Sequence, residues 1–318
     1  MSNAVGSEFC ALGIDTSNYT TSAAAVMTDG TCKSEKQLLP VAPGTLGLRQ
    51  SDAVFSHVKQ FAEVFSRLEI AEADIRAIGV SSRPRNIDGS YMPCFIYGVS
   101  VAETLASALG VPVYRFSHQQ GHIAAAVFSS RCEHLLSGPF MCFHASGGTT
   151  ELLRVNGMDD ITIAASAGDI SVGQLIDRTG VMLGLPFPAG PALESLSSGG
   201  TLPEKPVIKI KDGRCALSGF ENKAKTMLEK GVAPENIAFY IIETVALTVK
   251  QLCDNYNPDN LPVLFVGGVM SNERIKNILS GNNRFFAEPR FSSDNAAGIA
   301  YLALNKYLSA ADQYNRKV

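Results

Sequence analysis

Apolar residues in the first part of the chain recur at two different spacings, and these predict alternating strands and helices. Short apolar runs bounded by polar turns are typical of strands. Apolar side chains three and four residues apart indicate one face of a helix. Strands are expected at residues 10–16, 20–27, 75–81 and 111–116. Helices are expected at residues 51–68 and 92–109. This alternation predicts an α/β fold with a parallel or mixed sheet covered on its faces.

A second strand–turn–strand unit begins near the middle of the chain, at residues 140–145 and 150–155. It repeats the arrangement of the first two strands, as expected of a duplicated fold. Further helices are expected at residues 172–183, 189–198, 221–229, 234–256 and 295–308, with a strand at 262–266. We therefore predict a first lobe of residues 1–137 completed by a C-terminal helix at 299–318, and a second lobe of residues 138–298.

The composition is that of an ordinary globular protein. The chain has 318 residues, 46% of them hydrophobic and 18% charged, which suits two lobes of about 150 residues each. No run approaches the ~20 apolar residues of a membrane span. The N-terminus has no signal-peptide pattern and residues 1–4 look like an expression scar, so no membrane contact and a cytoplasmic location are expected. The net charge of −3 means that nucleic acid contact would need a local patch or a partner.

Two histidines, His118 and His122, follow a predicted strand and are four residues apart. On a helix this spacing places both imidazoles on one face, where two neutral nitrogens can bind one metal ion at about 2 Å. Two packing or surface histidines are the alternative. Gln119 stands where the H-E-x-x-H motif of zinc proteases has its glutamate, so a protease would lack its general base.

Two glycine-containing turns follow predicted strands and suit a phosphorylated ligand. Glycine lets the backbone approach an anionic group, and nearby hydroxyl and N–H groups can bind phosphate oxygens. The first turn contains Ala145, Ser146, Gly147, Gly148 and Thr149. The second turn contains Gly267, Gly268 and Asn272. An ordinary hairpin turn and a helix cap are the alternatives that these residues leave open.

Two acidic residues stand at the ends of predicted elements. Asp15 ends the first strand, where a carboxylate can hold a metal or its water near phosphate. Asp294 precedes the last helix. An Asx turn and an N-cap are the respective alternatives.

The ordered set of motifs resembles the TsaD (Gcp) family of tRNA threonylcarbamoyladenosine synthases, once described as O-sialoglycoprotein endopeptidases. The correspondence extends from about residue 11 to residue 307. Besides the histidine pair and the two turns, it includes a Gly-Ile-acid-Thr-Ser strand, a Gly-Glu-Ala-x-Asp-Lys helix, a Gly-Gly-Pro loop, a Ser-Gly-Leu-Lys segment and a Thr-Asp-Asn-Gly segment. These are matched at residues 13–17, 173–178, 189–191, 218–221 and 293–296.

The resemblance implies an actin-like (ASKHA) fold, whose two lobes carry duplicated mixed β-sheets and close on a nucleotide. It implies that His118, His122 and Asp294 bind one divalent metal. Iron, zinc and manganese all suit this ligand set.

The resemblance also implies a nucleotide site and a reaction. Asp15, Asp177, Gly190 and the two glycine turns would contact ATP, AMP or an acyl-adenylate. A carbamoyl or threonylcarbamoyl group would pass from a carbamoyl-adenylate to a tRNA adenosine. A protein partner of the same fold or a second copy of the chain is expected, and no residue is assigned as a general base.

The chain departs from the family pattern at several positions. Thr149, Gln174 and Arg178 replace a histidine, a glutamate and a lysine of the family motifs. Residues 82–93 replace a short Gly-Pro-Gly-rich loop.

In this loop Arg83, Arg85 and Tyr91 are predicted to contact an anionic or planar acceptor, with a plain surface loop as the alternative. The departures indicate a divergent paralogue. A different acceptor and a nucleotide-binding scaffold therefore stay open, whereas a metalloendopeptidase is disfavoured.

Overall fold

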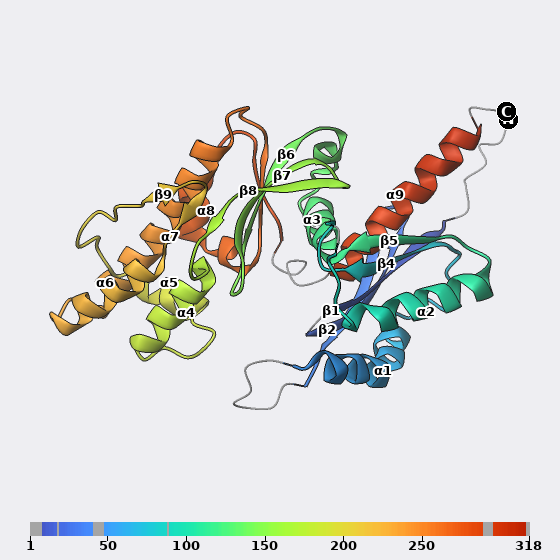
Figure 1. Ribbon diagram of the computed structural model, residues 1–318, viewed down its shortest axis with the longest axis horizontal. Helices are drawn as coiled ribbons and strands as arrows, with labels where there is room; N and C mark the ends of the chain where they lie inside the picture. The colour runs from blue at the N-terminus through green and yellow to red at the C-terminus, as the bar shows by residue number, and fades with distance from the viewer. Residues whose placement is uncertain (1–7, 18, 41–47, 88, 289–294, 316–318) are drawn as a thin grey trace. The chain divides into compact units, whose positions relative to one another are not determined.

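Two compact units make up the chain in the computed structural model, which describes residues 8–17, 19–40, 48–87, 89–288 and 295–315 (Figure 1). The first unit contains Met1–Ser129 and Arg290–Val318, and the second contains Ser130–Pro289. The sequence predicts boundaries after residue 137 and before residue 299, and both lie later in the chain than those of the structure. Helix α9 (Asn295–Asn315) belongs as a whole to the first unit because it packs along the sheet of that unit.

The sheet of the first unit has five strands in the order β3-β2-β1-β4-β5. They are β1 (Cys10–Ser17), β2 (Thr20–Met27), β3 (Cys32–Leu38), β4 (Ile75–Arg83) and β5 (Val113–Ser117). The pairs β1–β2 and β2–β3 are antiparallel, whereas β1–β4 and β4–β5 are parallel. β1 is buried along nearly its whole length because helices cover both faces of the sheet, which explains its almost continuous apolar run.

Alternate residues of β1 face different helices. Leu12 and Ile14 belong to the core that the sheet forms with the first two helices. Gly13 instead faces α9, and a Cβ atom there would lie 2.0 Å from the Ala296 carbonyl oxygen. Glycine is therefore required for this close approach. The helices of the unit besides α9 are α1 (Gln50–Ser66), α2 (Cys94–Leu109) and α3 (His118–Ser129).

The sheet of the second unit has seven strands in the order β12-β11-β6-β7-β8-β10-β9. They are β6 (Phe140–Ala145), β7 (Thr150–Gly157), β8 (Asp160–Ala167), β9 (Ile210–Lys211), β10 (Arg214–Cys215), β11 (Val263–Val266) and β12 (Arg284–Phe286). The pairs β6–β7 and β7–β8 are antiparallel, whereas β11 runs parallel to β6 and β12. The strands β8-β7-β6-β11-β12 repeat the order and directions of the first sheet, and β10 and β9 are added beyond β8. The predicted duplication and mixed sheets are thus confirmed.

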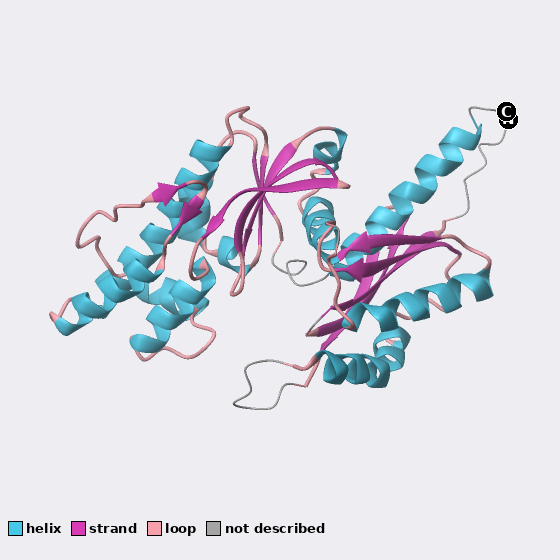
Figure 2. Cartoon of the chain, in the orientation of Figure 1, coloured by secondary structure: helices cyan, strands magenta, loops and turns pink. Residues whose placement is uncertain are grey.

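Helices of the second unit pack around α7, which is buried along much of its length. They are α4 (Val172–Met182), α5 (Gly190–Ser197), α6 (Ser218–Glu229), α7 (Pro234–Tyr256) and α8 (Glu273–Leu279), with 3-10 helices η1 (Glu133–Ser137) and η2 (Gly268–Ser271) (Figure 2). None of the helices in the described ranges is both long and apolar enough to cross a bilayer.

Candidate functional site

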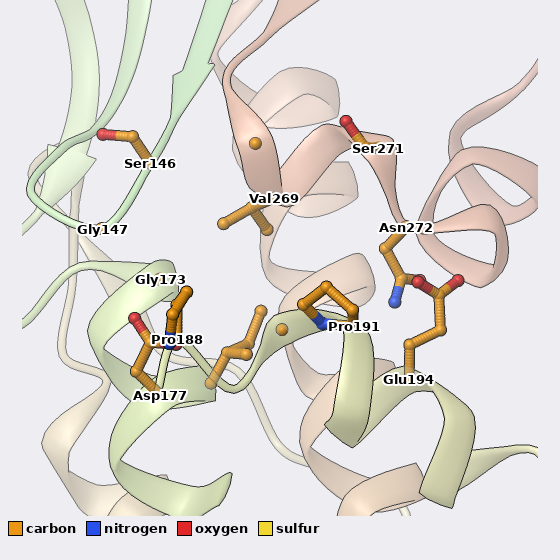
Figure 3. A pocket seen from close by; sticks show the side chains of 13 residues that line it. Ser146, Gly147, Gly173, Asp177, Pro188, Pro191, Glu194, Val269, Ser271 and Asn272 are labelled. Atoms are coloured by element: carbon orange, nitrogen blue, oxygen red, sulfur yellow. The ribbon is translucent and has the colours of Figure 1, made fainter. Parts of the chain in front are cut away.

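A cavity of about 350 Å³ opens in the second unit beside the carboxyl ends of the adjacent parallel strands β6 and β11 (Figure 3). This edge of an α/β sheet is where ligands commonly bind, because loops and helix N-termini meet there. The lining residues are Ser146, Gly147, Gly173, Ile176, Asp177, Pro188, Gly190, Pro191, Glu194, Gly268, Val269, Ser271 and Asn272.

One wall of the cavity is the turn after β6, held against the start of α4. The Ser171 hydroxyl donates to the Gly147 carbonyl at 2.8 Å and also caps α4 by accepting from the Gln174 N–H. A Cβ atom on Gly173 would lie 2.4 Å from the Ser146 carbonyl oxygen. The backbone of the turn therefore lies in direct contact with the backbone of α4. The partial positive charge of the helix N-terminus lies at this wall, as an anion site requires.

A second wall is the loop between α4 and α5, which Asp177 fixes. Asp177 Oδ1 accepts a hydrogen bond from the Ala189 N–H at 2.8 Å. Pro188 and Gly190, on either side of Ala189, then line the cavity. The Asp177 carboxylate of α4 thus holds the backbone of this loop at the edge of the cavity.

The third wall joins α5 to the start of α8. Glu194 Oε1 accepts from the Glu273 N–H at 2.7 Å, and the Asn272 side chain caps α8 by accepting from the Ile275 N–H at 2.9 Å. Figure 3 shows the Glu194 carboxylate and the Asn272 amide side by side at the edge of the cavity. Val269 adds an apolar surface. The cavity therefore combines carboxylate and amide groups with apolar walls.

The structure brings six of the predicted nucleotide contacts to this cavity: Ser146, Gly147, Asp177, Gly190, Gly268 and Asn272. The other residues of the two turns support it from behind. The N–H groups of Gly148 and Thr149 donate to Ser146 Oγ. Ala145 is fully buried, and a Cβ atom on Gly267 would lie 2.1 Å from the Ala145 carbonyl oxygen.

Several residues that line the cavity were not predicted from the sequence, and Glu194 is the most important of them. Glu194 lies one helical turn beyond Gly190, and that spacing is the only signal that points to it. Ile176, Pro188, Pro191, Val269 and Ser271 were likewise not assigned.

The predicted metal ligands His118 and His122 begin α3 in the first unit, directly after β5. Their ring centroids are 4.6 Å apart, as the shared helix face predicted. Between them, Gly121 meets α9, because a Cβ atom on Gly298 would lie 2.0 Å from the Gly121 carbonyl oxygen. The close crossing of α3 and α9 thus fixes the position of both imidazoles.

Asp15 lies in the first unit beside His118. Its Oδ2 is 2.9 Å from His118 Nδ1, and its side chain also accepts from the Ser81 hydroxyl and, at 2.9 Å, from the Ser17 N–H. Burial would raise the pKa of Asp15, but the charge of His118 and these hydrogen bonds hold it well below its usual range. Asp15 is therefore a carboxylate that accepts the Nδ1 proton of His118.

This contact leaves the other ring nitrogen, Nε2, as the candidate metal donor of His118. Asn295 Nδ2 lies 3.0 Å from that nitrogen and also contacts Nδ1. The third predicted ligand, Asp294, lies outside the described residues. Within the described ranges no group of three His, Cys, Asp or Glu side chains is arranged to hold a metal. The imidazole pair and the carboxylate behind it fit the chemistry of a divalent metal site.

The loop that carries Arg83, Arg85 and Tyr91 adjoins the histidine helix. Arg83 ends β4 and pairs in register with Ser117 of β5. The Gln119 N–H donates to the Pro84 carbonyl at 3.0 Å, which ties the loop to the start of α3. Arg83 and Arg85 are half-buried, and Tyr91 is 65% exposed. Of the three predicted acceptor contacts, Arg83 lines a cavity of this loop.

Comparison with known proteins agrees with this architecture. The chain is 28% identical over 266 residues to the tRNA N6-adenosine threonylcarbamoyltransferase of Nautilia profundicola, covering 79% of this chain and 78% of that protein. The enzyme of the same name from Paramagnetospirillum magneticum is 29% identical over 275 residues, covering 78% and 76%.

Solved structures share the fold. HypF of T. kodakarensis gives a TM-score of 0.59 at 14% identity, covering 94% of this chain and 48% of that one. Component A of (R)-2-hydroxyglutaryl-CoA dehydratase from Acidaminococcus fermentans gives a TM-score of 0.55 at 17% identity, covering 94% and 99%. These likenesses support the predicted actin-like fold. The family model for tRNA N6-adenosine threonylcarbamoyltransferase (TsaD) matches residues 56–301. Since this is well over half of the chain, the protein belongs to that family of transferases.

Proposed function

We propose that this protein transfers a carbamoyl or threonylcarbamoyl group from its adenylate to an amine, with the N6 amine of a tRNA adenosine as the first acceptor to test. The cavity of the second unit carries the proposal. Carboxylate, amide and backbone groups from three separate segments converge on it. Family membership supports the group that is transferred and the tRNA acceptor.

Each wall of the cavity suits one part of an adenylate. The turn at Ser146 and Gly147, with the start of α4, would bind the phosphate. The carboxylates of Asp177 and Glu194 would accept hydrogen bonds from the ribose hydroxyls. The apolar surface of Val269 would pack against the adenine ring.

In the proposed reaction the acceptor nitrogen attacks the carbonyl carbon of the adenylate. The bond between that carbon and the phosphate oxygen breaks, AMP leaves with the electron pair, and the nitrogen loses a proton. The partial positive charge at the start of α4, beside the Ser146 turn, would offset the negative charge of the departing phosphate. The proton of the nitrogen passes to water or to a phosphate oxygen of the departing AMP, and no side chain is assigned as a general base.

In the first unit, His118, His122 and Asp294 would hold the divalent metal. When bound, it would supply positive charge that offsets negative charge on phosphate or acyl oxygens. Asp15 would orient His118 by accepting its Nδ1 proton, with Ser81 and Ser17 holding the carboxylate. The proposal includes a cytoplasmic location and a partner of the same fold or a second copy of the chain.

A transferase with a different acceptor is the second candidate, and the arginine loop after β4 favours it. A scaffold that only binds nucleotide is less well supported, because both histidines stand on one helix face with a carboxylate behind one of them. A metalloendopeptidase function is disfavoured, because this chain has no glutamate beside the histidine pair to act as the general base.

Calorimetric titration of AMP and ATP into the metal-loaded and metal-stripped protein tests the nucleotide site. Asp177→Ala removes a carboxylate from the cavity and is expected to weaken AMP binding about ten-fold or more, a loss of about 1.4 kcal/mol. Glu221→Ala is the matched control, since it removes a carboxylate of the same unit that pairs with Arg178 outside the cavity lining.

Absence of AMP and ATP binding under every metal condition contradicts the nucleotide site. Transfer is measured separately, as incorporation of labelled threonylcarbamoyl into tRNA with and without partner proteins. Nucleotide binding without incorporation under any condition rejects tRNA as the acceptor and leaves the second candidate.

A further inference from the structure

The loop after β4 contains a half-buried positive charge that has no role in the proposed reaction. Arg83 is half-buried at the end of β4. Its Nη1 donates to the Ser82 hydroxyl at 3.3 Å, and its Nη2 donates to Asn86 Oδ1. Both partners are neutral. These bonds use two of the five N–H donors of a guanidinium.

Arg83 differs in this from most of the arginines that the structure describes. Seven others pair with a carboxylate within 4 Å: Arg67, Arg76, Arg115, Arg154, Arg178, Arg274 and Arg284. No carboxylate among the described residues pairs with Arg83; Asp88 lies outside them. A partly desolvated guanidinium without a counter-charge is costly, and an anionic ligand would remove that cost.

Arg83 lines a cavity of about 420 Å³ together with Asn86, Ile87, Gly89 and Ser90. The Arg85 N–H donates to Ser90 Oγ at 3.0 Å, which leaves the Ser90 hydroxyl proton available to a ligand. The bond from Arg83 to Asn86 fixes the plane of the guanidinium. The cavity thus presents an oriented guanidinium edge and a hydroxyl donor, the groups that bind carboxylate or phosphate oxygens.

The cavity also lies near the histidine helix. β4 and β5 end side by side at Arg83 and Ser117, and His118 follows Ser117 directly. The hydrogen bond from Gln119 to Pro84 ties the loop to the same helix. An anion held at Arg83 would therefore be near the group of residues that includes Asp15 and His118.

We propose that this cavity binds an oxyanion of the acceptor, the carboxylate or phosphate that positions its amine for transfer. The inference rests on the proposed function. The oxyanion has two sources, a small anionic molecule or a phosphate of tRNA. A single arginine in a concave site and a net charge of −3 favour the small molecule.

Hydrogen exchange of the full-length protein, read by mass spectrometry, tests this site locally. Inorganic phosphate and acetate are added as probes, with AMP present throughout to occupy the cavity of the second unit. Peptides spanning residues 82–93 should exchange more slowly with the probe in the wild-type chain. Arg83→Gln should raise the probe concentration that gives half-protection about ten-fold or more. The concentration for Arg83→Lys should lie between those of the wild type and Arg83→Gln, because lysine keeps the charge but lacks the planar guanidinium.

Arg115→Gln is the matched control, because Arg115 is an exposed arginine of the same unit that already pairs with Glu103. It should leave the protection unchanged. The proposal is overturned if neither probe nor tRNA protects the loop, or if Arg83→Gln responds as the wild type does. If Arg83→Gln does not fold, wild-type behaviour of Arg83→Lys overturns it.

Separate arms distinguish the two sources and the two proposals. Protection by phosphate or acetate assigns a small anion, whereas protection by tRNA alone assigns its backbone. AMP binding of Arg83→Gln should equal that of the wild type, since the nucleotide cavity lies in the other unit. Loop protection in a chain that fails to bind AMP would reject the nucleotide site while leaving the anion site intact.

Discussion

Acidification is expected to destabilise the protein through His57, which is fully buried in α1 with 0% exposure. Its Nδ1 lies 2.7 Å from Thr21 Oγ1, and Gln60 Nε2 donates to the same hydroxyl at 2.7 Å. Because the Thr21 oxygen accepts from Gln60, its proton can be donated to Nδ1, which suits the neutral imidazole. Burial lowers the pKa of His57 to about 4, against a smaller opposing effect of the Asp15 charge.

The proton balance gives the magnitude of this effect. In the unfolded chain His57 titrates near pH 6.5, whereas in the folded chain it stays neutral down to about pH 4. Between these values the unfolded chain binds more protons, so stability falls as the pH falls from 6.5 towards 4. A change from pH 7.5 to 5.0 should lower the free energy of unfolding by about 2 kcal/mol through this group alone.

Urea unfolding at both pH values measures the effect, followed by circular dichroism because the chain has no tryptophan. His57→Gln keeps an acceptor for the Thr21 hydroxyl but does not titrate. It should be less stable than the wild type at pH 7.5 and lose about 2 kcal/mol less on acidification. His134→Gln, at an exposed histidine, should match the wild-type loss. Equal losses for wild type and His57→Gln, within about 0.5 kcal/mol, refute the reasoning.

Two further substitutions test the two sites. Asp15→Asn removes the carboxylate behind His118 and is expected to lower zinc affinity roughly 10- to 100-fold in a chelator competition. Asp52→Asn, at an exposed carboxylate of the same unit, is its control, and equal affinities contradict the orienting role. Gly173→Ala places a Cβ atom 2.4 Å from the Ser146 carbonyl oxygen, so it should cost about 1–3 kcal/mol and weaken AMP binding, measured by denaturation and calorimetry. Gly219→Ala, in α6 where a Cβ meets open space, should leave AMP binding unchanged and should not lower stability.

The hydrophobic pattern predicted most of the strands and helices that form the core, because burial on defined faces imposes a period on the sequence. It did not predict β8, β12 or the buried helix α3. β3 escaped because it is an edge strand with exposed polar residues and no alternating pattern. The short strands β9 and β10 escaped because two residues carry no period. These elements form by pairing with strands already in place, so their own sequences do not specify them.

The candidate sites likewise contain residues that the sequence predicted and residues that it did not. Asn272 was found because it lies between a glycine-containing turn and a predicted helix, whereas Gly190 came from the resemblance to the family. Glu194 was missed because a glutamate on a helix is ordinary until the fold places it at a cavity. Asp15 was assigned to the nucleotide, which stays a prediction, and its contact with His118 was not foreseen. Partners so far apart in sequence are set by topology, which local patterns do not contain.

The departures from the family pattern have unequal consequences. Gln174 takes the place of a glutamate, and either residue completes the capping box with Ser171. Arg178 takes the place of a lysine, and its ion pair with Glu221 at 3.3 Å needs only a positive charge. Both replacements therefore keep the local structure around the cavity of the second unit.

Two other departures change the chemistry that the chain presents. The turn of Thr149 is held by backbone bonds to Ser146, so replacing the histidine of the family removes an imidazole without disturbing the turn. Arg83 adds a charge, with a cavity in front of it, where the family has a glycine-rich loop. A transferase that keeps its nucleotide cavity and gains an anion site elsewhere would use the same activated donor. We therefore expect its divergence to lie in the acceptor that receives the group.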